Sequence, residues 1–191
     1  MTEEEAGEKA GAYFRSGYNC SQSVFLVFAP QLGLAADTAA KVSQAFGGGI
    51  CRLRETCGTL NGMLMALSLL RGSADGSDKA AKDALYREGQ LLAQQFRRDN
   101  GSIICRELLG LAPAGGTGRM LRNSTVEGDG TAPVSEARTE AYYKKRPCPE
   151  LCRYAARLFQ RYLDGKLSAG PEPAAAADGA AAQKTGSGET A

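Results

Sequence analysis

The chain has 191 residues, of which 43% are hydrophobic, and a formal net charge of +2. This length suits one domain, and the small net charge gives no electrostatic case for binding nucleic acid or a membrane surface. The chain contains six cysteines and no histidine, which excludes Ser-His-Asp and Cys-His catalytic groups, mixed Cys/His zinc sites and histidine-ligated haem.

The N-terminal residues, MTEEEAGEKAG, are acidic and polar, unlike the basic start and apolar run of a secretory signal. No run of about 18 uncharged apolar residues exists, so we expect no transmembrane helix and no membrane partner. Both features favour a cytoplasmic location. Stable disulfides are rare there, and clustered cysteines more often bind metal or carry out redox chemistry.

Apolar residues recur with helical spacing along most of the chain, and glycines mark where several of the periodic segments end. The predicted helices are 3–17, 20–32, 37–46, 55–71, 78–98, 102–109 and 149–163. No segment shows the alternation that is typical of a strand. The sequence therefore predicts an all-α fold, a compact bundle of about six helices.

The segment 55–71 has the most buried composition of these helices. Gly58, Gly62 and Ala66 recur at every fourth position and form a strip of small side chains. Because small side chains let helix axes come close, we expect another helix to pack against this strip.

Two segments differ from the helical pattern. Residues 112–135 are rich in Gly, Ser, Thr and Pro, and we expect a flexible insertion there. Residues 165–191 contain mainly Ala, Gly and Pro with almost no bulky apolar side chain, and we expect a disordered tail. The folded cysteine-containing domain is therefore predicted to span residues 1–164.

Four cysteines lie where a helix is expected to begin: Cys20, Cys57, Cys105 and Cys148. A helix N-terminus carries partial positive charge and favours the thiolate, which is both the nucleophile and the metal ligand. The repeated arrangement favours thiol redox or metal chemistry over the alternative that each cysteine is a small buried hydrophobic residue. We expect at least three of the four to lie together in space.

The same cysteines and their neighbours resemble the family of redox-active proteins named C_GCAxxG_C_C after its cysteine pattern. The similarity runs from about Phe14 to Phe159 and rests on residues 17–22 (GYNCSQ), 46–49 (FGGG), 55–62 (ETCGTLNG), 105–110 (CRELLG) and 148–149 (CP). Thr59 stands where the family signature has alanine. The resemblance implies a redox role and leaves Cys51 and Cys152 outside the family pattern.

Cys51 and Cys152 each have two interpretations. Cys51 is either an incidental loop thiol or a resolving partner of Cys57 across a tight loop. Cys152 lies four residues after Cys148, so the two could share one metal ion, although a direct disulfide there would be strained. Because Cys152 lies in an apolar run, core packing is the simpler interpretation.

We therefore predict a cysteine cluster used for electron transfer, thiol–disulfide exchange or metal binding, with Cys20, Cys57, Cys105 and Cys148 as both catalytic and metal-ligating residues. The cofactor would be an iron–sulfur cluster or zinc, and the partner a redox protein. The sequence leaves open whether the chain is an oxidoreductase or an electron-transfer component, and whether it forms a homo-oligomer. The alternatives are a metal-binding or delivery protein without redox change and a helical interaction module with inert thiols.

Gly47, Gly48, Gly49 and Gly58 are predicted to let the backbone approach the thiols or a bound cofactor closely. The glycine run lacks the lysine and hydroxyl residue of a Walker loop, so nucleotide binding is disfavoured.

Cys57 combines a helix start, a following glycine, and Arg52 and Arg54 nearby in sequence. These features predict that Cys57 is the most thiolate-like of the six cysteines.

Overall fold

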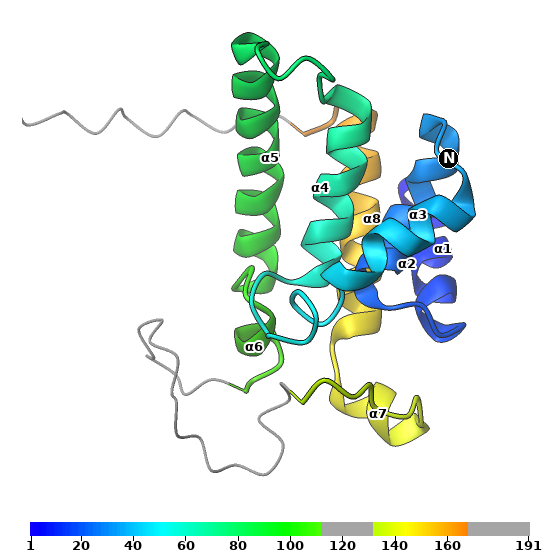
Figure 1. Cartoon of the computed structure of the whole chain (residues 1–191). Coiled ribbons are helices and arrows are strands. Elements are labelled where there is room, and N and C mark those ends of the chain that lie inside the picture. The colour runs from blue at the N-terminus through cyan, green and yellow to red at the C-terminus, as the bar shows by residue number, and fades with distance from the viewer. Residues whose placement is uncertain (112–131, 168–191) are drawn as a thin grey trace, which may run out of the picture.

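The computed structural model describes residues 1–111 and 132–167, and Figure 1 shows them as a bundle of helices. The elements in chain order are α1 (Glu3–Arg15), α2 (Cys20–Phe28), the 3-10 helix η1 (Ala29–Leu32), α3 (Ala36–Ser43), the 3-10 helix η2 (Gln44–Phe46), α4 (Gly58–Arg71), α5 (Lys79–Asn100), α6 (Cys105–Leu108), α7 (Glu140–Lys145) and α8 (Cys148–Leu163). Six of the α-helices have eight or more residues, and the described residues contain no strand beyond one isolated bridge between Thr56 and Ile104. The predicted all-α bundle is confirmed.

Several predicted boundaries differ from the structure. The predicted helix 20–32 is divided, because Pro30 cannot donate a backbone hydrogen bond and α2 continues as the short helix η1. The helix expected from 55 begins at Gly58, and α7 was not predicted. Residues 112–131 of the predicted insertion and residues 168–191 of the predicted tail lie outside the described residues.

The core lies where α8 packs against α1 and α2, with α4 against α2 and α5 against α4 and α8. Aromatic side chains fill its centre. Phe28 and Phe159 meet edge to face with ring centroids 4.8 Å apart, and both rings are almost completely buried. Such a pair contributes about 1 kcal/mol beyond the burial of its surface.

The strip of small residues on α4 allows the close approach that the sequence predicts. A Cβ atom added to Gly62 would lie 2.4 Å from the backbone oxygen of Ser21 on α2. Ala66, one turn later, is fully buried. The first turn of α2, which carries Cys20, is therefore held directly against α4.

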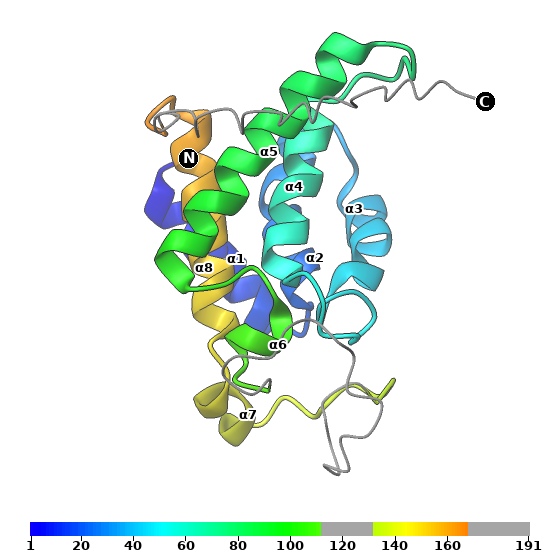
Figure 2. The same cartoon turned by 90° about the vertical axis from the view of Figure 1, so that its left-hand side faces the viewer.

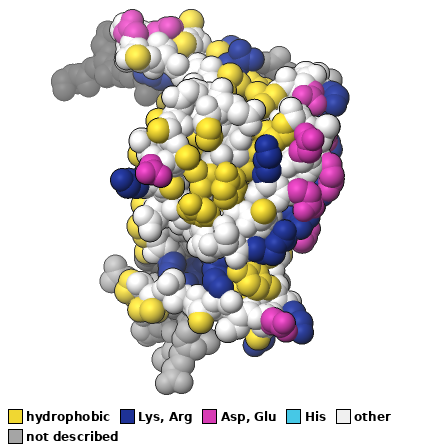
Figure 3. Space-filling model, turned by 90° about the vertical axis from the view of Figure 1, so that its right-hand side faces the viewer, with side chains coloured by type: hydrophobic (Ala, Val, Ile, Leu, Met, Phe, Trp, Pro, Cys, Tyr) yellow, Lys and Arg dark blue, Asp and Glu magenta, His cyan; other side chains and the backbone are white. Residues whose placement is uncertain are grey.

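A row of ion pairs joins α8 to α1, which we call the α1–α8 seam. Arg153, Arg157 and Arg161 pair with Glu8, Glu4 and Glu3, respectively. Arg157 Nη2 lies 2.7 Å from Glu4 Oε1, and Arg161 Nη2 lies 2.9 Å from Glu3 Oε2. Figure 3 shows acidic and basic side chains gathered along one edge of the molecule.

One end of the bundle gathers segments that are far apart in sequence. Residues 47–57, α6 and α7 all lie at this end, close to the first turns of α2, α4 and α8 (Figure 2). In the part of the chain that the structure describes, no helix is both long and apolar enough to cross a lipid bilayer.

Candidate redox site

The four cysteines of the predicted cluster line one cavity at this end of the bundle. The cavity has a volume of about 130 Å³, and Cys20, Cys57, Cys105 and Cys148 all contribute to its wall. Each is a free cysteine. The prediction that these cysteines lie together is confirmed, since four separate segments of the chain bring them to the same cavity.

Cys20 is the first residue of α2, and its position is fixed by a capping box. The Asn19 side chain accepts hydrogen bonds from the backbone N–H groups of Ser21 and Gln22, and the Gln22 side chain accepts one from the Asn19 N–H group. The Gly48 N–H group donates to Cys20 Sγ at 3.4 Å. A donated hydrogen bond and the N-terminus of α2 both favour negative charge on this sulfur.

Backbone pairing brings Cys57 and Cys105 together. The Cys57 N–H group donates to the Ile103 oxygen at 2.8 Å, and the Cys105 N–H group donates to the Glu55 oxygen at 2.6 Å. These bonds surround the isolated bridge between Thr56 and Ile104. Cys57 is then the N-cap of α4, and Cys105 is the first residue of α6, so both thiols face the same cavity.

The predicted glycines let the backbone approach these cysteines closely. A Cβ atom on Gly49 would lie 2.6 Å from Cys105 Cβ, and one on Gly58 would lie 2.4 Å from Cys20 Sγ. A Cβ atom on Gly47 would lie 2.2 Å from the Asn19 side chain that caps α2. Gly48 and Gly49 also have φ angles of 65° and 72°. These glycines therefore let the backbone come close to Cys20, to Cys105 and to the cap of α2, and their predicted role in holding a cofactor stays a prediction.

The loop after the glycine run has an unusual backbone. Ile50, Cys51, Arg52 and Arg54 all have positive φ angles between 46° and 64°. Non-glycine residues in this conformation cost about 1 kcal/mol or more each, and they persist where the surrounding structure holds them. This loop carries Arg52 and Arg54 into the wall of the cavity.

The prediction that Cys57 is the most thiolate-like cysteine is wrong. Its side chain is only 5% exposed, and burial raises its pKa to about 12, with the charge of Cys20 adding to the effect. Arg54, whose nearness in sequence motivated the prediction, instead interacts with Cys105. Neutral thiol is therefore the resting form of Cys57 at physiological pH.

The same two causes act on the other cavity cysteines. Burial raises the pKa of Cys105 and of Cys148, and the charge of Cys20 raises both further. A hydrogen bond and the charge of Arg54 partly oppose this rise in the pKa of Cys105. The four thiols therefore act on one another, and negative charge on Cys20 disfavours ionisation of the other three.

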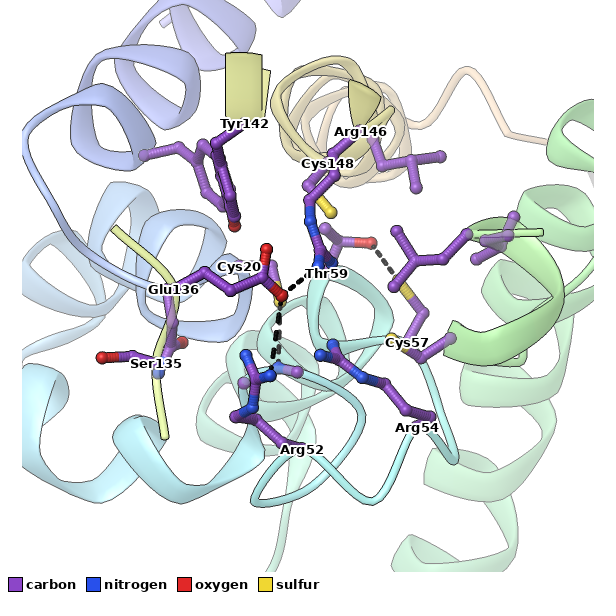
Figure 4. Close-up of a pocket in the computed structure, with 18 of the residues that line it drawn as sticks. Cys20, Arg52, Arg54, Cys57, Thr59, Ser135, Glu136, Tyr142, Arg146 and Cys148 are labelled. Carbon is purple, nitrogen blue, oxygen red and sulfur yellow. Dashed lines mark hydrogen bonds and ion pairs between the residues drawn. The ribbon is translucent and has the colours of Figure 1, made fainter. Parts of the chain in front are cut away.

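Two further polar contacts shape the thiol cluster. Cys57 Sγ and Thr59 Oγ1 lie 3.2 Å apart, within hydrogen-bond distance, and Thr59 is fully buried. Thr59 therefore supplies a hydroxyl group beside one thiol. Figure 4 shows this contact at the wall of the cavity.

Four arginines and one glutamate also line the cavity: Arg52, Arg54, Arg138, Arg146 and Glu136. Glu136 forms ion pairs with Arg52, at 3.6 Å, and with Arg146. Arg138 donates to the backbone oxygens of Phe14 and Tyr18, at 3.2 and 3.1 Å. Three of these lining residues, Glu136, Arg138 and Arg146, were not predicted from the sequence. The position of Arg146, directly before Pro147 and Cys148, is a signal that could have pointed to one of them.

The remaining cysteines lie outside the cavity wall. Cys152 is fully buried in the core, with its sulfur 3.9 Å from the Cys20 backbone oxygen, as the core interpretation predicts. Cys51 is exposed, whereas Cys57 is buried in the cavity wall. A Cys51–Cys57 couple stays a prediction.

Metal binding by the cavity cysteines also stays a prediction. Across residues 1–111 and 132–167, no group of three or more cysteine, aspartate or glutamate side chains is arranged to hold a metal ion. The cavity cysteines share a wall without forming a ready ligand set.

Comparison with known proteins gives one match. The family model described as "Putative redox-active protein (C_GCAxxG_C_C)" matches residues 18–162, which include all four cavity cysteines. No curated protein and no solved structure matches the chain. The match covers most of the chain and supports a general redox role, so the chain belongs to the C_GCAxxG_C_C family.

Proposed function

We propose that the protein is a two-electron redox protein whose cavity cysteines cycle between thiol and disulfide. The observation that carries this proposal is the shared cavity: four segments of the chain each deliver one cysteine to it, and all four are free. Cysteines that serve only as core packing need no common cavity, and Cys152 in the core is an example of such a residue.

Cys20 is the proposed nucleophile. Its sulfur accepts the Gly48 hydrogen bond at the start of α2, and both features support a thiolate. Its charge raises the pKa of the three other cavity cysteines, Cys57, Cys105 and Cys148. A buried neutral thiol among those three would act as the resolving cysteine.

The proposed reaction is exchange with a disulfide substrate. The Cys20 thiolate attacks one substrate sulfur and forms a mixed disulfide, and the other substrate sulfur leaves and takes up a proton. A second cavity thiol loses its proton and attacks Cys20 Sγ, which releases the second substrate sulfur as a thiol. The cavity has then lost two electrons and the proton of the second thiol and holds one disulfide. The substrate disulfide has become two thiols, with one proton from that cavity thiol and one from solvent.

Metal or iron–sulfur binding is the second candidate function. A metal centre held by four thiolates carries excess negative charge, and the arginines in the cavity wall would compensate that charge. The thiols would hold the metal only after rearrangement, since they form no ready ligand set in the described residues. Metal analysis and the absorption spectrum of anaerobically purified protein test this candidate, including the non-redox metal-delivery alternative.

Disulfide mapping tests the proposed function. Fully reduced protein is treated with a stoichiometric amount of a small disulfide, the remaining thiols are alkylated, and peptides are identified by mass spectrometry. We expect intramolecular disulfides that contain Cys20, and we expect Cys20→Ser to remove them. Cys51→Ser is the matched control, because Cys51 is exposed and outside the cavity wall, and it should change nothing. The absence of any disulfide between cavity cysteines would contradict the proposal and favour an interaction module with inert thiols.

A further inference from the structure

We propose that the arginine-lined mouth of the cavity binds a carboxylate of the substrate, and that Glu136 occupies this position until the substrate displaces it. The inference rests on the proposed function, because it names the substrate class: a small disulfide that bears a carboxylate near its sulfur atoms.

The first argument for a carboxylate ligand is the charge of the cavity wall. Four lining residues are arginines and one is a glutamate, so the wall keeps a net positive charge even with Cys20 as a thiolate. A cavity lined by one sign of charge attracts ligands of the opposite sign. Arginine is also the residue best suited to carboxylates, because its planar guanidinium group can donate two parallel hydrogen bonds.

Glu136 shows which anion this wall accepts. Its carboxylate lies between Arg52 and Arg146, and Figure 4 shows its side chain extending into the cavity that Cys20 and Cys148 also line. Although burial alone would raise it, the pKa of Glu136 is lowered by its hydrogen bond to Arg146 and by the charges of Arg146, Arg52 and Arg54. The wall therefore stabilises an ionised carboxylate at this point.

The surroundings of Glu136 indicate that the carboxylate can be displaced. The residues from Ala132 to Ala137 form no helix or strand, and the Glu136 side chain is 43% exposed. Its arginine partners are far less exposed, at 20% for Arg52 and 16% for Arg146, and Arg52 is also fixed by donating to the Ala132 oxygen at 2.7 Å. Arg52 and Arg146 are thus more buried than the Glu136 carboxylate that lies between them.

The size of the cavity limits the ligand. Its volume of about 130 Å³ is below the roughly 300–1,000 Å³ of pockets for drug-sized ligands. On the face shown in Figure 3, Lys and Arg side chains lie in a recess towards the lower end of the molecule. A short disulfide with its carboxylate on the arginines would have its sulfur atoms in the cavity that the thiols also line.

A series of three disulfides of similar size tests the inference. The rate at which each oxidises reduced protein is measured for dithiodiglycolate, which is anionic, hydroxyethyl disulfide, which is neutral, and cystamine, which is cationic. Each rate is divided by the rate of the same compound with free cysteine. On this scale we expect dithiodiglycolate to react about ten-fold faster than hydroxyethyl disulfide, and cystamine to be slowest. The preference should shrink at high salt, because the site is partly open to solvent.

Three variants test whether the preference for the anionic disulfide comes from this cavity wall. Glu136→Gln removes the internal competitor and should raise the rate with dithiodiglycolate several-fold more than it changes the rate with hydroxyethyl disulfide. Arg52→Lys keeps the charge but loses the paired donors, and it should reduce the anionic preference. Glu140→Gln is the matched control, since Glu140 is exposed on α7, pairs only with Lys144 among the described ion pairs, and lies outside the cavity wall.

Binding of thiodiglycolate, which has the carboxylates but only one sulfur and cannot be reduced, separates the two proposals. Calorimetry measures whether thiodiglycolate binds the original protein and whether it binds Glu136→Gln more tightly. If it does both, but none of the three disulfides oxidises the cavity cysteines, then the proposed function fails and the carboxylate site stands. If all three disulfides oxidise the cavity at their intrinsic rates and thiodiglycolate does not bind, the carboxylate site is overturned and the proposed function stands. If Arg52→Lys lowers helicity, its rates reflect misfolding, and the Glu136→Gln rates alone then decide whether the carboxylate site exists.

Discussion

The α1–α8 seam and the cavity use arginine in opposite ways. In the seam, three arginines of α8 each meet a separate glutamate of α1. The cavity wall instead contains four thiols, four arginines and one glutamate, Glu136, which forms ion pairs with Arg52 and Arg146. Charge that is balanced pair by pair holds two helices together, whereas an excess of one sign in a cavity is available for a ligand or an ionised thiol. The two groups of arginines therefore differ in what balances their charge: a separate glutamate for each arginine in the seam, and only one glutamate for four arginines among the described residues that line the cavity.

The largest expected effect concerns thiol reactivity inside and outside the cavity. Because the pKa of Cys57 is raised to about 12, its thiolate fraction at neutral pH is about a thousandth of that of an ordinary cysteine. We expect alkylation of reduced protein by iodoacetamide to modify the exposed Cys51 orders of magnitude faster than Cys57, with rates read by mass spectrometry. Equal rates at the two cysteines would show that the cavity does not protect its thiols.

Gly49→Ala should damage the cavity while leaving the seam intact. The added Cβ atom would lie 2.6 Å from Cys105 Cβ and 2.8 Å from the Glu55 nitrogen, at a φ angle of 72°. We expect the free energy of unfolding in urea to fall by about 2–4 kcal/mol. Gly76→Ala is the matched control, because nothing lies within 4 Å of its added Cβ atom. Equal stability of the two variants would contradict the tight packing of the glycine run.

Alkaline pH should weaken the fold through the cavity thiols. In the unfolded chain Cys57 titrates near its ordinary pKa of 9.0, whereas in the folded protein it titrates near 12. The unfolded state therefore loses its proton first, and stability that is complete below about pH 9 falls as the pH rises towards 12, by about 1.4 kcal/mol per pH unit for this thiol. Urea unfolding at several alkaline pH values, under reducing conditions, should show a shallower loss for Cys57→Ser. Parallel curves would contradict the raised pKa.

The smallest change in the free energy of unfolding is expected for a variant of the α1–α8 seam. Arg157→Gln breaks its pair with Glu4, and both side chains are substantially exposed, so the free energy of unfolding should fall by only about 0.2–1 kcal/mol. Most of that difference should disappear in about 1 M salt, where the Debye length is about 3 Å. A larger, salt-independent loss would indicate that the seam contributes through packing of the Arg157 side chain, whose stem lies against Gly7.

Much of the fold could be predicted from the sequence, because helix periodicity and glycine stops are local signals. The helix α7 was missed, since it has only six residues and none of them is buried in the core. The positive φ angles of Ile50, Cys51, Arg52 and Arg54 could not be predicted either, because only the surrounding structure makes non-glycine residues adopt them.

The candidate site was predicted in part. The shared position of four cysteines at helix starts, together with the family resemblance, indicated that they lie together. The pKa of Cys57 was mispredicted because burial is not visible in a short motif, and because Arg54, although it lines the same cavity, acts on Cys105. Glu136, Arg138 and Arg146 were missed since they come from a segment far along the chain that has no helical apolar pattern.

An equilibrium redox titration tests the central claim most directly. Protein is equilibrated anaerobically with glutathione buffers of increasing oxidation, and free thiols are counted by alkylation and mass spectrometry. The account predicts a reversible two-electron transition in which two cavity thiols disappear together, and which Cys20→Ser removes and Cys51→Ser does not. Cavity thiols that stay reduced across the whole range, or that oxidise only through Cys51, would contradict it.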